Sequence, residues 1–156
     1  MNYNRAFYGW ELNDFLSCYS PNLYLGCFPR DKIPKLLHGQ CCIVNSAKSG
    51  PGEVGVHWMC YAQSYLFGLM VLDSNGTDIK TIRANYPYKS AQFCHYNVET
   101  LTEPNSSYCG LYSTFFATLH YSTQTNKCLE QDVANSRLYF GFAGCWLANL
   151  AKFNKQ

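Results

Sequence analysis

The chain has 156 residues, 47% of them hydrophobic and 17% aromatic, and it carries a formal net charge of +2. This length favours a single domain over residues 1–156, and the apolar content excludes a disordered or low-complexity chain. The small net charge does not indicate a nucleic-acid-binding protein, although the chain could still carry a local basic patch.

The first half of the chain contains one helix signal followed mainly by strand signals. Apolar residues spaced among acidic and polar ones predict a short amphipathic helix over residues 10–18. The turn-rich segment 26–34 is interpreted as a loop, and 41–45 is a brief β-prone run. Two further β-compatible runs, 54–62 and 66–73, predict an antiparallel hairpin.

The second half contains the strongest helix signals of the sequence. A short helix is predicted over 76–82, and a strand over 93–101. Cap-type residues precede a helix predicted over 108–120, and a nearly all-apolar helix is predicted over 135–153. The core-facing stripe of the helix over 108–120 is expected to contain Leu111, Phe115 and Leu119.

The cysteines and the longest apolar runs indicate the cellular compartment in which the protein functions. Nine cysteines are an odd number, which favours free thiols in a reducing compartment over a disulfide scaffold. No run approaches the ~20 apolar residues that span a bilayer, and the first residues do not form a secretory signal. We therefore expect a protein that is neither secreted nor anchored in a membrane.

The predicted hairpin places a histidine and an aspartate on one face. With the turn centred on Tyr65, His57 lies directly opposite Asp73, at a Cβ separation of about 4.5 to 5.5 Å. A carboxylate there holds one imidazole nitrogen and leaves the other to accept a proton. A slip of one residue would turn Asp73 to the other face. The plain alternatives are a structural or surface histidine and an aspartate that only forms a turn.

Among the cysteines, Cys109 has the most suitable surroundings for a nucleophile. It falls in the first turn of the helix predicted over 108–120, where unpaired backbone amides and the helix dipole favour a thiolate. The same amides can donate to an oxyanion, and Gly110 leaves space for a substrate. The plain alternative is a buried, inert thiol. Metal binding is weakly supported, because no Cys-x-x-Cys or His-x-x-x-His spacing occurs.

Several stretches of the chain carry a specific resemblance. They are Cys41-Cys-Ile-Val-Asn-Ser-Ala47, Gly55-Val-His-Trp-Met59, Leu72-Asp-Ser-Asn-Gly-Thr-Asp78 and Pro104-Asn-Ser-Ser-Tyr-Cys-Gly-Leu111. In their amino-acid sequences and in their order along the chain, these stretches resemble the adenovirus maturation protease (adenain) family, over roughly residues 10–120. The resemblance implies an α+β papain-like cysteine protease related to the ubiquitin-like-protein proteases, with a small mixed sheet packed between helices. It also implies a catalytic triad in which the base, the orienting acid and the nucleophile are His57, Asp73 and Cys109.

The resemblance also extends to residues around the triad, with two departures. The acid of the family is often Glu, and Asp73 looks like the variant of its ubiquitin-like relatives. The family's oxyanion Gln, seven residues before the nucleophile, is replaced here by Thr102. Thr102, Asn105 and the backbone amide of Cys109 are therefore the oxyanion candidates. Trp58 looks like the family's aromatic neighbour of the base, with a core tryptophan as the alternative.

The resemblance implies a viral endopeptidase that cleaves capsid and core precursors in the host nucleus and the virion. It implies no metal or organic cofactor, and no membrane partner. In the family a viral peptide, disulfide-linked to an upstream cysteine, activates the enzyme, and Cys94 is the candidate here, with a plain buried cysteine as the alternative. DNA is a second activator, for which we consider Lys32, Lys35, Arg83 and Lys89.

Two other functions are compatible with the same residues. One is a deubiquitinase-like or deSUMOylase-like enzyme that acts on host conjugates through the same triad. The other is a catalytically degenerate virion binding protein, which the substitution at Thr102 suggests.

Overall fold

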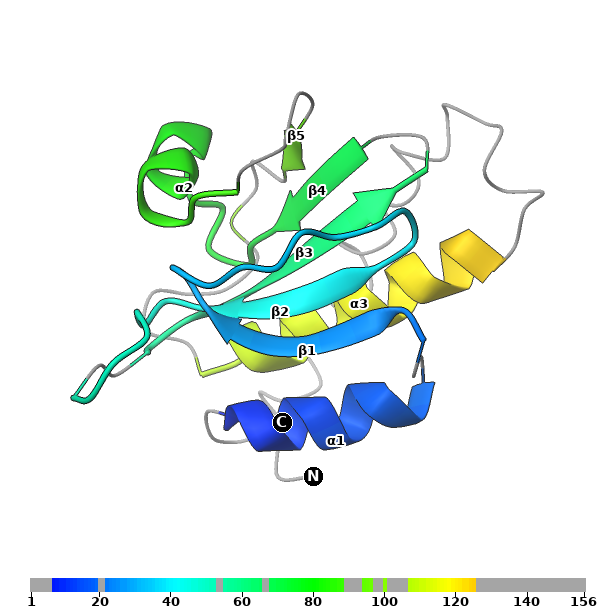
Figure 1. Cartoon of the computed structure of the whole chain (residues 1–156), viewed down its shortest axis with the longest axis horizontal. Helices are drawn as coiled ribbons and strands as arrows, with labels where there is room; N and C mark the ends of the chain where they lie inside the picture. The colour runs from blue at the N-terminus through cyan, green and yellow to red at the C-terminus, as the bar shows by residue number, and fades with distance from the viewer. Residues whose placement is uncertain are drawn as a thin grey trace.

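The computed structural model of the chain describes residues 7–19, 22–52, 55–65, 68–88, 94–96, 100 and 107–125. Within these ranges the elements are α1 (Gly9–Tyr19), β1 (Tyr24–Pro29), β2 (Cys41–Asn45), β3 (Trp58–Ser64), β4 (Gly68–Leu72), α2 (Ile79–Asn85), β5 (Cys94–Tyr96) and α3 (Cys109–Thr125). The fold is a mixed α+β arrangement (Figure 1). None of the helices in the described ranges combines the length and the apolar character needed to cross a membrane.

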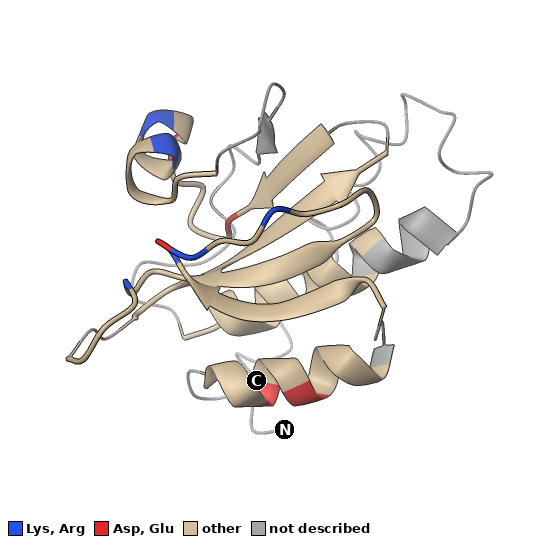
Figure 2. Cartoon of the chain, in the orientation of Figure 1, with Lys and Arg blue, Asp and Glu red and all other residues tan. Residues whose placement is uncertain are grey.

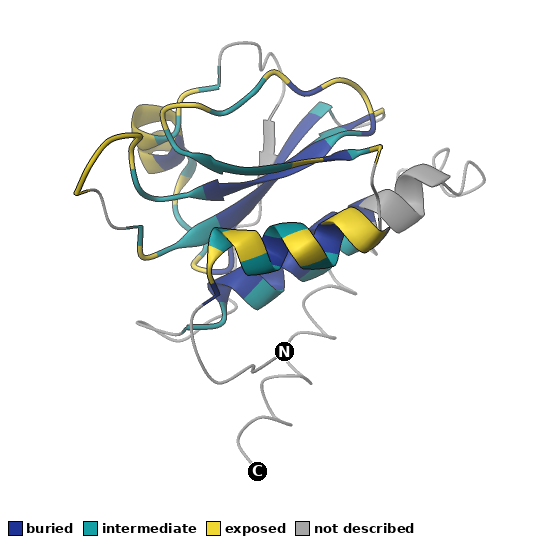
Figure 3. Ribbon diagram, turned by 60° about the horizontal axis from the view of Figure 1, so that its bottom comes forward, coloured by how far each residue is buried: buried dark blue, intermediate teal, exposed yellow. Residues whose placement is uncertain are grey.

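The strands form one mixed sheet of five strands in the order β1-β2-β3-β4-β5. The inner pairs β2–β3 and β3–β4 are antiparallel, and the outer pairs β1–β2 and β4–β5 are parallel. Helices α1 and α3 lie along one face of the sheet, and α2 lies beyond the other face (Figures 1 and 3). Since both faces are covered, the central strands are buried on both sides and have nearly continuous apolar sequences.

Alternate residues of the central strands divide the core into two layers. Cys41, Ile43, Cys60, Ala62, Met70 and Leu72 pack with α1 and α3 against residues such as Leu12, Leu16 and Phe116. Cys42, Val44, Met59, Tyr61, Leu69 and Val71 pack on the opposite face with Ile82 of α2. The two layers follow directly from the two-residue period of side chains along a strand.

The segment interpreted as a loop over 26–34 is partly a strand, and that prediction was wrong. β1 pairs in parallel with β2, but its register shifts between Tyr24 and Cys27. Gly26 lies in this irregularity with a φ of +125°, and Pro29 ends the strand at the edge of the sheet. Gly and Pro therefore mark a bulge and an edge here, both of which resemble turn signals in a sequence.

The hairpin is confirmed, but its register differs from the prediction by two residues. Tyr61 pairs with Val71, where the turn centred on Tyr65 predicted Leu69, and the last pair is Ser64 with Gly68. An error of two residues leaves every side chain on its predicted face, because side chains alternate with a period of two. His57 and Asp73 therefore change from directly opposed residues to diagonal neighbours.

Some predicted helix and strand boundaries differ from those in the structure, and some predicted elements lie outside the described residues. Asp78 caps the N-terminus of α2, since its carboxylate accepts hydrogen bonds from the Thr81 amide at 3.0 Å and the Thr81 hydroxyl at 2.6 Å. This cap starts the helix later than the predicted residue 76. The helix over 135–153 lies outside the described residues, and only Cys94–Tyr96 of the strand over 93–101 is described as a strand.

The core-facing stripe predicted for α3 is confirmed in part, because the most deeply buried face of the helix lies beside it. The fully buried face contains Tyr112, Phe116, Ala117 and His120. Leu111 and Phe115 are only partly buried, although they pack against the same core, and the side chain of Leu119 is outside the description. One buried polar group of this face, the Thr114 hydroxyl, donates a hydrogen bond to the Gly110 carbonyl at 2.9 Å.

His120 should make the stability of the fold depend on pH. The fully buried ring donates from Nε2 to the Gly39 carbonyl at 3.0 Å, and burial lowers the pKa of His120 from 6.5 to about 4 despite that bond. The unfolded chain therefore binds more protons between these values, so the stability is complete above pH 6.5 and falls as the pH decreases toward 4. Moving from pH 6.5 to 5 should lower the free energy of unfolding by about 2 kcal/mol.

Urea denaturation at pH 6.5 and pH 5 measures this effect. The variant His120→Gln keeps a donor for Gly39 but cannot titrate, so its pH dependence should be smaller than that of the wild type. His38→Gln, which removes an exposed histidine, is the matched control and should behave as the wild type. An equal pH dependence in His120→Gln and the wild type would contradict this account.

Candidate active site

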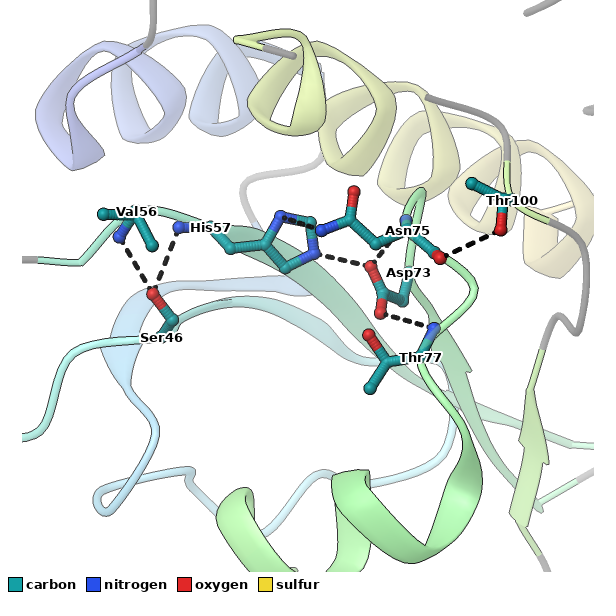
Figure 4. Close-up of polar contacts among 7 residues, drawn as sticks. All are labelled: Ser46, Val56, His57, Asp73, Asn75, Thr77 and Thr100. Atoms are coloured by element: carbon teal, nitrogen blue, oxygen red, sulfur yellow. Dashed lines mark hydrogen bonds and ion pairs between the residues drawn. The ribbon is translucent and has the colours of Figure 1, made fainter. Parts of the chain in front are cut away.

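The two strands of the hairpin bring a histidine and an aspartate together at one end of the sheet. His57 immediately precedes β3, and Asp73 immediately follows β4. The His57 Nε2 atom lies 2.5 Å from Asp73 Oδ1 (Figure 4). The predicted histidine–carboxylate pair is therefore present, with the diagonal geometry that the register requires.

Asp73 is buried and held as an acceptor of several hydrogen bonds. Its side chain is 1% exposed, and it accepts from the backbone amides of Asn75 at 2.9 Å and Thr77 at 3.1 Å. The tight turn that supplies these amides includes Gly76, with a φ of +62°. Burial alone would raise the pKa of Asp73, but the hydrogen bonds from His57 and Thr77 lower it overall. Asp73 thus remains a carboxylate that can orient the ring.

The backbone of His57 is fixed by Ser46, which the sequence did not indicate. The Ser46 hydroxyl oxygen accepts from the amides of Val56 at 2.9 Å and His57 at 3.1 Å (Figure 4). The Ser46 amide in turn donates to the His57 carbonyl at 2.9 Å. These bonds continue the pairing of β2 with β3 past the last ladder residues, and so hold the base in place.

Cys109 is the first residue of α3, as the cap-type residues before it predicted. The residue is 4% exposed. Cys109 interacts with His57 in a way that raises the pKa of the imidazole. The side chain of Cys109 is therefore at the N-terminus of α3 and within interaction range of the His57 ring. Of the three residues predicted as a triad, His57 and Asp73 are directly hydrogen-bonded, and Cys109 interacts with His57.

The imidazole of His57 is strongly biased toward its charged form. Burial lowers its pKa, but the hydrogen bond with Asp73 and its negative charge, together with the interaction with Cys109, raise the pKa of His57 from 6.5 to about 9. Because Nε2 is engaged by Asp73, Nδ1 is the nitrogen that can exchange a proton with the thiol. The His57 ring can thus carry a positive charge at neutral pH.

The expectation that Gly110 leaves space for a substrate was wrong. A Cβ atom at Gly110 would lie 3.1 Å from Phe7 Cδ2 and 3.4 Å from Trp58 Cδ1. The missing side chain instead lets these aromatic rings pack on the start of α3. Trp58 also donates from Nε1 to the Phe7 carbonyl at 3.0 Å. Trp58 is therefore a packing residue of the core that also follows the base directly in the chain.

Several predicted residues lie outside the described structure. Thr102, Asn105 and Lys89 are among them, and of Cys94 only the backbone, in β5, is described. Lys32 and Lys35 lie in the connection from β1 to β2, and Arg83 lies in α2 (Figure 2). In contrast, the charged residues of α1 are all acidic.

Comparison with known proteins gives no independent assignment. No family model matches the sequence, and no curated protein matches it either. Within the described ranges, no group of three His, Cys, Asp or Glu side chains could hold a metal ion.

Proposed function

We propose that the protein is a cysteine endopeptidase of the adenain type, with a papain-like fold and the triad His57, Asp73 and Cys109. The observation that carries the proposal is one line of contacts. A buried carboxylate holds Nε2 of an imidazole at 2.5 Å, and the pKa of that imidazole is raised further by a cysteine at the start of a helix. Few structural roles require a base, its orienting acid and a thiol in this order.

The chemistry follows from these positions. His57 takes the proton of Cys109 at Nδ1, and the thiolate attacks the carbonyl carbon of the scissile peptide bond. The oxyanion that forms accepts hydrogen bonds from unpaired amides at the start of α3, including that of Cys109. His57 then gives its proton to the leaving amine, and a thioester with Cys109 forms. A water molecule, deprotonated by His57, attacks the thioester and releases the acid and the thiol.

A second oxyanion donor is part of the proposal. Thr102 and Asn105 are the candidate side chains, since the family's Gln is absent from the matching position. Losing one oxyanion donor typically costs about 10²- to 10³-fold in rate. An enzyme with only the backbone donor would therefore be slow, and turnover measurements should use long incubations.

We propose precursor polypeptides of a viral capsid or core as the substrates, cleaved at short glycine-containing sites in the host nucleus and the virion. This follows the family resemblance, as do an activating viral peptide bound at Cys94 and activation by DNA. The basic residues Lys32, Lys35 and Arg83 are the proposed DNA contacts among the described residues. No cofactor is required by the steps above.

The proposal is tested by looking for the acyl-enzyme. The full chain is incubated with a glycine-containing peptide library and, separately, with ubiquitin-type and SUMO-type fluorogenic substrates, each with and without DNA. We expect cleavage of library peptides and a thioester adduct on Cys109, detected by mass spectrometry after acid quenching. Cleavage of ubiquitin-type or SUMO-type substrates alone would support the conjugate-processing enzyme. No adduct and no cleavage in any arm would support a degenerate binding protein.

A further inference from the structure

The indole ring of Trp58 contacts the starts of two helices. One end of the ring lies at Gly110, where an added Cβ atom would be 3.4 Å from Trp58 Cδ1, and the other end lies at Gly9, where an added Cβ atom would be 3.3 Å from Trp58 Cη2. Both glycines are in the first turn of a helix, Gly9 in α1 and Gly110 in α3. Because neither position carries a side chain, the ring can touch both helix starts at once.

Phe7 completes this contact from the segment before α1. Its carbonyl accepts a hydrogen bond from Trp58 Nε1 at 3.0 Å. Its side chain covers Gly110, where an added Cβ atom would be 3.1 Å from Phe7 Cδ2 and 3.2 Å from Phe7 Cβ. Phe7 is 4% exposed and belongs to the core that α1 and α3 share with the sheet. Phe7 and Trp58 therefore hold each other, and both contact the residue that follows Cys109.

This contact lies one residue away from the base on one side and one residue away from the nucleophile on the other. Trp58 is the first residue of β3 and follows His57, whereas Gly110 follows Cys109 in α3. A change in how the indole packs on Gly110 should therefore change the separation of His57 and Cys109. Reaction rates depend steeply on such separations, since a misplacement of about 1 Å can cost about 10²-fold.

We propose that Phe7 is a positioning residue that sets the geometry between His57 and Cys109 by holding Trp58 against Gly110. This inference rests on the proposed function, because that geometry matters only if His57 acts on the Cys109 thiol. Since Phe7 is buried, its effect reaches the reaction through the two residues that it contacts and not through the substrate.

The test measures how far His57 accelerates the alkylation of Cys109 by iodoacetamide in the full chain. The acceleration is the rate of Cys109 labelling in a protein with His57 divided by the rate in the same protein with His57→Ala, both followed by mass spectrometry. A change in access to the thiol affects both rates and cancels in this ratio. We expect Phe7→Ala to reduce the acceleration by about tenfold, and Phe7→Leu, which refills most of the space, by less than about threefold.

Gly110→Ala tests the same contact from the other side and removes nothing from the core, so it keeps the test available if Phe7→Ala does not fold. The added methyl group requires Phe7 to move by a few tenths of an ångström, so the acceleration should fall by about threefold to tenfold. In Phe7→Ala part of that space is empty, and the same substitution should then have a smaller effect. Equal effects of Gly110→Ala in both backgrounds would overturn the role of Phe7.

Controls separate this inference from a purely structural role and from the proposed function. Phe15→Ala removes a ring that packs on the same core from further along α1, so it should lower the melting temperature but leave the acceleration unchanged. If His57→Ala does not slow Cys109 labelling in the otherwise wild-type chain, the proposed function fails. If it does slow labelling, but Phe7→Ala and Gly110→Ala change only the melting temperature, the role of Phe7 alone is overturned.

Discussion

Replacing Cys109 by serine should lower kcat/KM for the best peptide substrate by roughly 10⁵- to 10⁶-fold, as removal of a nucleophile does in other triad enzymes. The hydroxyl is a far weaker acid than the thiol, so the charged pair with His57 cannot form at neutral pH. The residue is 4% exposed and its side chain changes by one atom, so the fold should be preserved. Turnover is measured with a fluorogenic form of that peptide, and folding by circular dichroism.

The matched control is Cys18→Ser, which makes the same change at an exposed thiol of α1. It should retain the turnover of the wild type. Hydrolysis by Cys109→Ser at a rate within tenfold of the wild type would show that another residue is the nucleophile. The proposed mechanism would then be wrong.

Replacing Asp73 by asparagine should have the second largest effect. The carboxylate accepts from the His57 ring and from the amides of Asn75 and Thr77, whereas an amide has only one acceptor atom. We expect kcat/KM to fall by about 10²- to 10⁴-fold, because the ring loses its orienting charge. The pKa of His57 should fall below its value of about 9, and the alkaline limb of the pH–rate profile should move down with it.

The free energy of unfolding of Asp73→Asn and a control substitution at a nearby aspartate are the checks for this variant. Leaving one of the buried amides without an acceptor should lower the free energy of unfolding by about 1 to 3 kcal/mol. Asp78→Asn makes the same change at the exposed N-cap of α2, where asparagine caps nearly as well, and it should alter neither property. If Asp73→Asn kept its turnover while losing stability, Asp73 would be only a turn residue.

The site was predictable from the sequence to the extent that it depends on strand periodicity and helix capping. His57 and Asp73 were assigned to one face although the register was wrong by two residues, because the side-chain period is also two. Cys109 was placed at a helix start because cap-type residues precede it. These features depend only on local sequence.

The remaining features depend on how distant segments pack. Ser46 acts through a loop that meets the residues before β3, and Asn75 acts through the turn after β4. Neither contact has a sequence signal, because each is set by loop geometry. Gly110 was misinterpreted for the same reason, since Phe7, which packs on it, is distant in the sequence. β1 was missed because Gly26 and Pro29 can mark either a turn or an irregular edge strand.

The most direct test of the account is the alkylation of Cys109 relative to Cys18 at pH 6. If a carboxylate-supported imidazole ionises the thiol, the buried Cys109 should react with iodoacetamide faster than the exposed Cys18, and His57→Ala should abolish that preference. Faster labelling of Cys18 in the wild type, or a preference for Cys109 that survives in His57→Ala, would contradict it.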